Sequence, residues 1–181
     1  MTTPALIQHI QASPFGEWMR NSVLAMPCVE STHVLAVALL FGTIMVVDLR
    51  LLGALDTRRP VTRLSGEMLR LTWAAFATAV VTGSLMFAAN AATYYGNTAF
   101  RLKMLALLAA GVNMAVFQLV TFRNVAVWDR GAPPRAARVA GALSLLLWIS
   151  VVFLGRWIGF TKGYDFQVPQ GINFDFSGSG P

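Results

Sequence analysis

His33 is the residue of this chain whose type and surroundings most readily suggest chemistry. It lies in an apolar stretch, residues 30–53, that is long enough to cross a bilayer, because a hydrocarbon core about 30 Å thick requires roughly 20 helical residues. Glu30 precedes it by three residues and would share its side of a helix. An imidazole at this depth could bind haem iron or copper, or carry a proton, with the carboxylate setting its charge. The alternative is a structural histidine that hydrogen-bonds to a neighbouring helix.

A haem or metal site at His33 would require a second ligand. The other histidine, His9, lies in the N-terminal segment, so no second histidine faces His33. Met86 and Met104, in the outer halves of two later apolar segments, could supply a thioether to haem or, with Met26 and Cys28, soft ligands to copper(I). Methionines more often fill gaps between helices. The sequence therefore predicts no bound cofactor, with haem b or copper at His33, Met86 and Met104 as the alternative.

Two more polar residues lie within apolar segments, and we expect a structural role for each. Asp48 lies near the end of its segment, where we expect an ion pair with Arg70 or Arg123, while Arg50 extends to lipid headgroups. Asn113 lies in the middle of the third apolar segment, and we expect it to hydrogen-bond to a hydroxyl group on a neighbouring helix.

Arg156 lies about 10 Å from the middle of the last apolar segment, at the depth estimated for His33. The first and fourth helices of an up-down bundle are usually neighbours. An unpaired arginine there would cost several kcal/mol unless it extended outward to the headgroups. We therefore predict that Arg156 points into the bundle and pairs with Glu30 beside His33. With Asn113 and Asp48, these residues make up the predicted polar set within the membrane.

Four apolar segments must position these residues. The chain is 56% hydrophobic and 12% charged, whereas soluble domains carry about 25% charged residues, so the composition indicates a membrane protein. The segments cover about residues 30–53, 71–94, 102–122 and 139–160. Their short connections predict an all-α fold, an up-down bundle of four transmembrane helices. Small residues crowd the second segment, which is therefore expected to be the most closely contacted helix.

Two further segments flank the predicted transmembrane domain of residues 30–160. Residues 1–29 carry apolar side chains at helical spacing, and predict one or two amphipathic helices on the membrane surface. Residues 1–13 lack the basic and apolar regions of a cleavable signal peptide. Residues 161–181 form a polar and aromatic tail.

The distribution of basic residues predicts the orientation. The net charge is +6, and nine of the 14 basic residues fall within residues 50–70 and 123–138. Such arginine-rich loops stay in the cytoplasm, so both termini are predicted to lie outside it. The net positive charge thus reflects the orientation in the membrane and does not indicate a nucleic-acid partner. The expected partners are the lipid bilayer and other membrane subunits.

Five pieces of the chain carry a resemblance to known proteins. They are Glu30-Ser-Thr-His33, Gly42 with Asp48-Leu-Arg-Leu-Leu-Gly53, Phe100-Arg-Leu-Lys103, Asn113, and Gly155-Arg-Trp-Ile158. Over most of residues 15–160 the chain resembles a family of uncharacterised bacterial inner-membrane proteins with four predicted spans. That family is distantly similar to the membrane part of copper-resistance D proteins and to cytochrome b561-like bundles. Such proteins often have a histidine late in the third span, where this chain has Gln118, so the resemblance does not imply a haem here.

These observations favour a non-enzymatic membrane protein, a small subunit or accessory protein of a larger assembly. The helices leave little of the chain for a soluble active site, and the sequence contains no phosphate-binding glycine loop or zinc motif. The alternative is a b-type cytochrome-like electron carrier or a copper-handling protein that uses His33.

Overall fold

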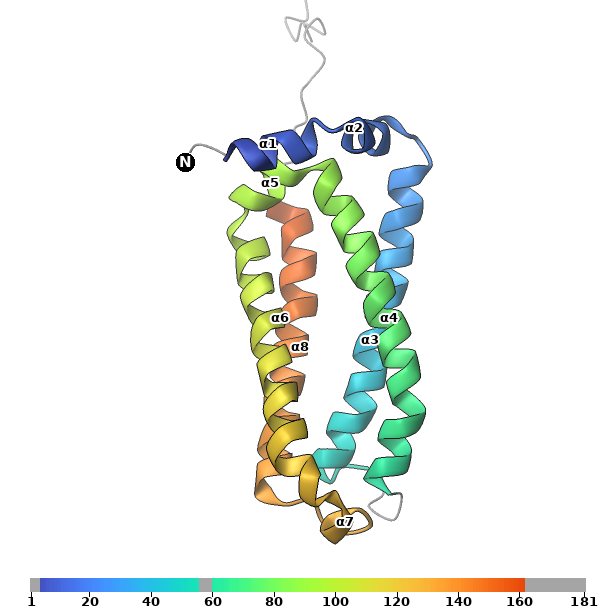
Figure 1. Cartoon of the computed structure of the whole chain (residues 1–181), viewed down its shortest axis with the longest axis vertical. Coiled ribbons are helices and arrows are strands. Elements are labelled where there is room, and N and C mark those ends of the chain that lie inside the picture. Colours follow the sequence, from blue (N-terminus) through green and yellow to red (C-terminus); the bar gives the residue numbers. More distant parts are fainter. Residues whose placement is uncertain (1–3, 56–59, 162–181) are drawn as a thin grey trace, which may run out of the picture.

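The computed structural model describes residues 4–55 and 60–161, and this part of the chain is almost entirely helical, without a strand (Figure 1). Four helices are long and apolar enough to cross a membrane, which confirms the predicted all-α class. They are α3 (Ala25–Leu52), α4 (Val61–Ala89), α6 (Thr98–Val116), which continues irregularly to Trp128, and α8 (Arg135–Thr161). The short helices are α1 (Ala5–Gln11), α2 (Pro14–Asn21), α5 (Ala91–Gly96) and α7 (Val125–Trp128). The predicted tail lies outside the described residues from residue 162 on.

The bounds of α4 differ from the predicted second segment at both ends. The helix begins at Val61, about ten residues early, because its first turns are charged and so fall outside an apolar window. Arg63 and Glu67 form an ion pair there, with Nε and Oε1 3.0 Å apart, one helical turn from each other. The helix ends at Ala89, since Asn90 leaves the helical conformation with φ of −136°, and the separate helix α5 follows.

The third span is a regular α-helix only as far as Val116. Residues Phe117–Thr121 form a π-helix and Phe122–Asn124 a 3₁₀ turn. This irregular stretch places Phe117 and Phe122 against a small core made by Leu51, Val61, Trp128 and Ala137. The predicted segment of residues 102–122 thus lies within a longer and less regular helical stretch, Thr98–Trp128.

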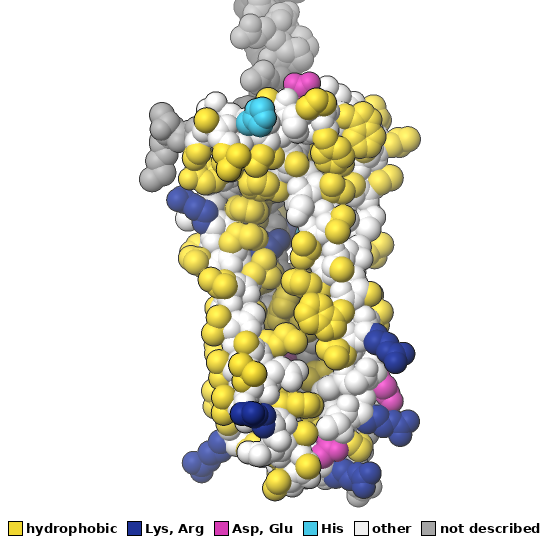
Figure 2. All heavy atoms as spheres, viewed as in Figure 1, with side chains coloured by type: hydrophobic (Ala, Val, Ile, Leu, Met, Phe, Trp, Pro, Cys, Tyr) yellow, Lys and Arg dark blue, Asp and Glu magenta, His cyan; other side chains and the backbone are white. Residues whose placement is uncertain are grey.

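The four long helices form two hairpins that meet along one side only. α3 packs against α4, α6 packs against α8, and the hairpins join through α3 and α8. α4 and α6 face each other without a packed interface of this kind. Figure 2 shows a hollow between them, which we call the α4–α6 seam and define by residues 61–89 and 98–116.

α3 is the most buried of the four, so the expectation that the second span would be the most contacted helix is wrong. Within the most apolar stretch of each helix, 33% of α3 is buried inside the protein, against 11% of α4. The reason is position, because α3 lies between α4 and α8. The small residues of α4 also spread over several faces: Ala75 is buried against neighbours, while Ala74 and Ala77 are exposed.

α1 and α2 lie across one end of the bundle (Figure 1), which agrees with the predicted amphipathic N-terminal helices. Polar contacts hold them there. Arg20 Nη1 donates to the carbonyl oxygens of Gln11, at 2.9 Å, and Ala89, at 2.6 Å. Gln11 Oε1 in turn accepts from the Ala92 amide at 2.7 Å. The guanidinium thus satisfies a carbonyl at the C-terminus of α4 and ties the N-terminal helices to the corner between α4 and α5.

The opposite end is closed by the segment after α7. The Asp129 carbonyl accepts from Arg50 Nη2, at 3.2 Å, and from the Val61 amide, at 3.1 Å. Its carboxylate accepts from the amide and the hydroxyl of Thr62, both at 2.9 Å. Asp129 therefore caps the N-terminus of α4 from a distant part of the chain. The Thr62 amide is the main reason that the pKa of Asp129 lies below its ordinary value.

Candidate functional site

His33 extends from α3 to α4, where it meets a hydroxyl group. Its Nδ1 lies 2.9 Å from Thr82 Oγ1. The Thr82 hydroxyl donates to the Thr78 carbonyl at 2.6 Å, so the imidazole is the donor in this contact. A Cβ at Gly83 would lie 3.1 Å from His33 Cε1, so glycine lets the ring approach α4 this closely. This is the contact that the structural interpretation of His33 predicts.

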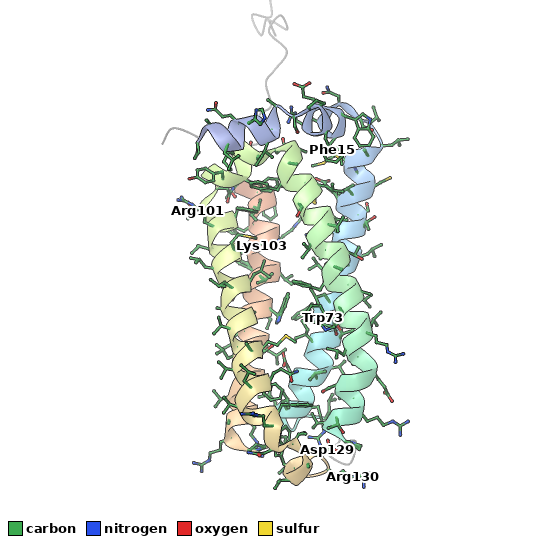
Figure 3. The ribbon with its side chains drawn as sticks, viewed as in Figure 1. Phe15, Trp73, Arg101, Lys103, Asp129 and Arg130 are labelled. Atoms are coloured by element: carbon green, nitrogen blue, oxygen red, sulfur yellow. The ribbon has the colours of Figure 1, made fainter. Side chains whose placement is uncertain are left out.

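Lys103 enters the same region from α6. Figure 3 shows its side chain extending from α6 into the space between that helix and α4. Its Nζ is close to α8 as well, since a Cβ at Gly155 would lie 3.4 Å from it. Its charge acts on His33. Within the described chain no hydrogen bond or ion pair accepts from this ammonium group.

His33, Thr82 and Lys103 together form what we call the outer polar cluster. It draws one side chain from each of three helices, α3, α4 and α6, at the end of the bundle where α1 and α2 lie. Its two ionisable members are a histidine and a lysine, so it offers hydrogen-bond donors and positive charge but no carboxylate. Sequence reasoning missed Lys103 as a site residue, although a lysine just inside an apolar segment was a usable signal.

The predicted pair between Glu30 and Arg156 does not form. Arg156 is exposed, and its Cζ lies 5.1 Å from the centre of the Phe160 ring. Its neighbour Gly155 faces α6, and consecutive residues of a helix are rotated by about 100°, so Arg156 points away from the bundle. Glu30 is also exposed. Burial, and then the Glu30 charge, raise the pKa of Tyr94 to about 12.

The sulfur candidates take different positions. Met86 is half-buried and lies one turn beyond Thr82 on the same face of α4, whereas the Met104 side chain is 40% exposed. Cys28 is exposed. Among the residues that the structure describes, no group of three or more His, Cys, Asp or Glu side chains could hold a metal ion. The haem or copper alternative therefore stays a prediction.

Asp48 and Asn113 contact α8 in the other half of the bundle. The Ser144 hydroxyl faces the Asp48 carboxyl, and Asn113 Nδ2 donates to the Ala140 carbonyl at 3.0 Å. The cross-helix bond predicted for Asn113 thus forms, with a backbone partner. Asp48 lies 15 residues from His33 along α3, or about 22 Å, so the predicted polar set is divided between two places.

The roles predicted for Asp48 and Arg50 are wrong. Asp48 takes part in no ion pair of the described chain, because it is rotated to the face of α3 that α8 covers. A Cβ at Gly141 would lie 3.1 Å from the Asp48 carbonyl, which shows how closely the two helices approach. Arg50 does not extend to the headgroups. It is fully buried and donates to carbonyls of the segment that closes this end.

The comparisons with known proteins give one family. Residues 20–161 match a family of unknown function, DUF6644. No curated protein and no solved structure matches the chain, and no similarity to copper-resistance D or cytochrome b561-like proteins was found. The match includes all four long helices and the whole outer polar cluster. The chain therefore belongs to this family of unknown function.

Proposed function

We propose that this protein is a non-enzymatic, multi-pass protein of the bacterial inner membrane, with both termini outside the cytoplasm. It serves a larger membrane assembly as a small accessory subunit, and it holds a membrane-borne amphiphile in the α4–α6 seam. The observation that carries this proposal is the seam itself: two transmembrane helices face each other without packing.

An amphiphile suits the chemistry of the seam. α4 and α6 keep large apolar side chains exposed on this side, among them Trp73 and Val80, which share one face of α4, and Met114, which shares the face of Lys103 on α6. Trp73 borders the seam (Figure 3). Helices in lipid associate through close packing, and these two lack it, so an acyl chain can fill the space with dispersion contacts. The donors of the outer polar cluster supply partners for a polar head at one end only.

The geometry of His33 supports a non-catalytic role. A general base must accept the proton of the nucleophile that it activates. Here the Thr82 proton is engaged with the α4 backbone, and the imidazole donates to the threonine oxygen. This arrangement holds two helices together instead of preparing a nucleophile.

The haem or copper alternative would use His33 Nε2, since Nδ1 is engaged by Thr82. We predict that no haem is bound, because His33 is the one histidine within the four apolar segments and Gln118 stands where similar proteins often have a second. Protein purified from membranes should then show no stoichiometric Soret band. A Soret band that disappears in His33→Ala would overturn this prediction.

Photo-crosslinking in detergent tests the proposed function. Benzoylphenylalanine at Trp73 reports on the seam, and the same group at Leu146, an exposed position on α8, reports on loosely held lipid. Purification in detergent strips loosely held lipid, so illumination should give a lipid-sized adduct at position 73 and none at position 146. No adduct at position 73, or an adduct to another protein there, would overturn the amphiphile proposal.

A further inference from the structure

Lys103 is the charged group of the seam whose position requires an explanation. A lysine near the end of a transmembrane helix usually extends to the headgroups. Arg101, two residues earlier on α6, does point away from the bundle (Figure 3). Lys103 instead lies half-buried against Gly155, without an acceptor in the described chain. The ammonium group therefore faces the place that an occupant of the seam would fill.

We propose that this occupant is an anionic phospholipid, whose phosphate binds Lys103 beside His33. The inference rests on the proposed function and names the head of the amphiphile. The phosphate diester supplies the acceptor that Lys103 lacks, in a charge-assisted hydrogen bond. A zwitterionic lipid carries its own ammonium group next to the phosphate, and this group competes with Lys103. The lipid is therefore one with a net negative charge, such as phosphatidylglycerol.

The depth of the cluster matches a phospholipid. Lys103, Thr82 and Gly155 lie five to seven residues from the nearest ends of α6, α4 and α8, which places them about 7–10 Å inside those ends. Trp157, half exposed on α8, lies at nearly the same level, and tryptophan marks the boundary between headgroups and acyl chains. A phosphate bound there lets its acyl chains run along the seam toward the middle of the bilayer.

The charges around the cluster agree with this choice. The nearest acid along α3, Glu30, lies one turn further out, is exposed, and acts on Tyr94. It does not compensate Lys103, because no ion pair joins them. His33 lies near enough for the charge of Lys103 to act on it, while its Nδ1 remains bound to Thr82. The site thus has one strong donor for one singly charged head.

Native mass spectrometry of the full chain, released from nanodiscs of phosphatidylglycerol and phosphatidylcholine, tests the proposal. The wild type should retain one phosphatidylglycerol after loosely held lipid is removed. Lys103→Gln should reduce this retention about tenfold or more, since a hydrogen bond between charged groups contributes about that factor. Lys103→Arg should restore it. The matched control is Arg101→Gln, which removes the same charge from the outward face of α6 and should retain lipid like the wild type.

Equal losses in Lys103→Gln and Arg101→Gln would overturn the proposal, because they would indicate general attraction of anionic lipid. Equal retention of phosphatidylcholine would overturn it too, but would leave the proposed amphiphile function intact. Retention of no lipid by the wild type would overturn both. Added inorganic phosphate should not displace the lipid, and displacement would assign the site to free phosphate. Size-exclusion profiles and circular dichroism confirm that each variant is folded.

Discussion

Gly16 illustrates how one residue fixes the position of the N-terminal helices. It lies in α2, where a Cβ would come within 2.9 Å of the Gln11 carbonyl oxygen and 3.0 Å of the Ala88 carbonyl oxygen. Real Cβ atoms do not approach backbone oxygens this closely, so only glycine lets α2 contact α1 and the end of α4 together. The polar contacts of Arg20 then hold this arrangement.

Gly16→Ala should therefore destabilise the protein. The added methyl group meets backbone oxygens that cannot move aside, and overpacking of this kind costs about 1–3 kcal/mol. The measurement is thermal unfolding in detergent, with Gly111→Ala in α6 as the control. A Cβ at Gly111 meets nothing within 4 Å, so that variant should be neutral or slightly stabilised. Equal unfolding temperatures for the two variants would contradict the close approach of α2.

Asp129 makes stability depend on pH in the acid range. Its folded-state pKa lies below the ordinary 3.8, chiefly because the Thr62 amide donates to the carboxylate. Its contribution is therefore complete above the ordinary value and is lost as the pH falls through the lower, folded-state value. Asp129→Ala should lose about 0.5–2 kcal/mol at neutral pH, as for other helix N-caps. Unfolding measured from pH 6 down to pH 3 should show a weaker acid dependence in Asp129→Asn than in the wild type.

At the scale of the helices, the small residues of α4 contact α3 on one face of the helix only. Gly83 and Ala79 lie on the side that meets His33, whereas Ala77 is exposed. Gly83→Leu would push the imidazole away from Thr82 and should lower the unfolding temperature, at a cost of about 1–3 kcal/mol. Ala77→Leu adds the same kind of bulk at an exposed position, away from His33, and should leave stability within error. If Gly83→Leu is as stable as the wild type, the contact between α3 and α4 is not as close as described.

The existence of these helices could be predicted from sequence, whereas their rotation could not. A long apolar run must be helical in lipid, since every backbone polar group needs an internal partner. The sequence does not show which side of such a helix faces a neighbouring helix, because lipid and the protein interior are both apolar. Gly155 and Arg156 are adjacent, yet the first faces Lys103 and the second faces outward. For the same reason the sequence did not identify Lys103 as a site residue. It resembles any interfacial lysine unless the packing of α8 against α6 is known.

At the scale of the whole molecule, the described residues, 4–55 and 60–161, close both ends of the bundle and leave one side open. α1, α2 and α5 cover one end, and the segment after α7 closes the other through Arg50 and Asp129. The α4–α6 seam opens sideways (Figure 2). We therefore expect the proposed occupant to reach the outer polar cluster from the plane of the membrane, which favours lipid-soluble molecules over solutes from either aqueous side.

The orientation of the molecule gives the last prediction. On the face shown in Figure 2, basic side chains gather toward the end where α7 lies, and such charge stays in the cytoplasm. In a Cys28→Ser background, Val23→Cys tests the N-terminal end, where Val23 is 85% exposed, and Ala132→Cys tests the exposed segment after α7. In intact spheroplasts, a membrane-impermeant maleimide should label position 23 and not position 132, while a permeant maleimide should label both. Because the outer polar cluster lies at the end of position 23, labelling of position 132 alone by the impermeant reagent would invert the topology and move the proposed lipid site to the cytoplasmic leaflet.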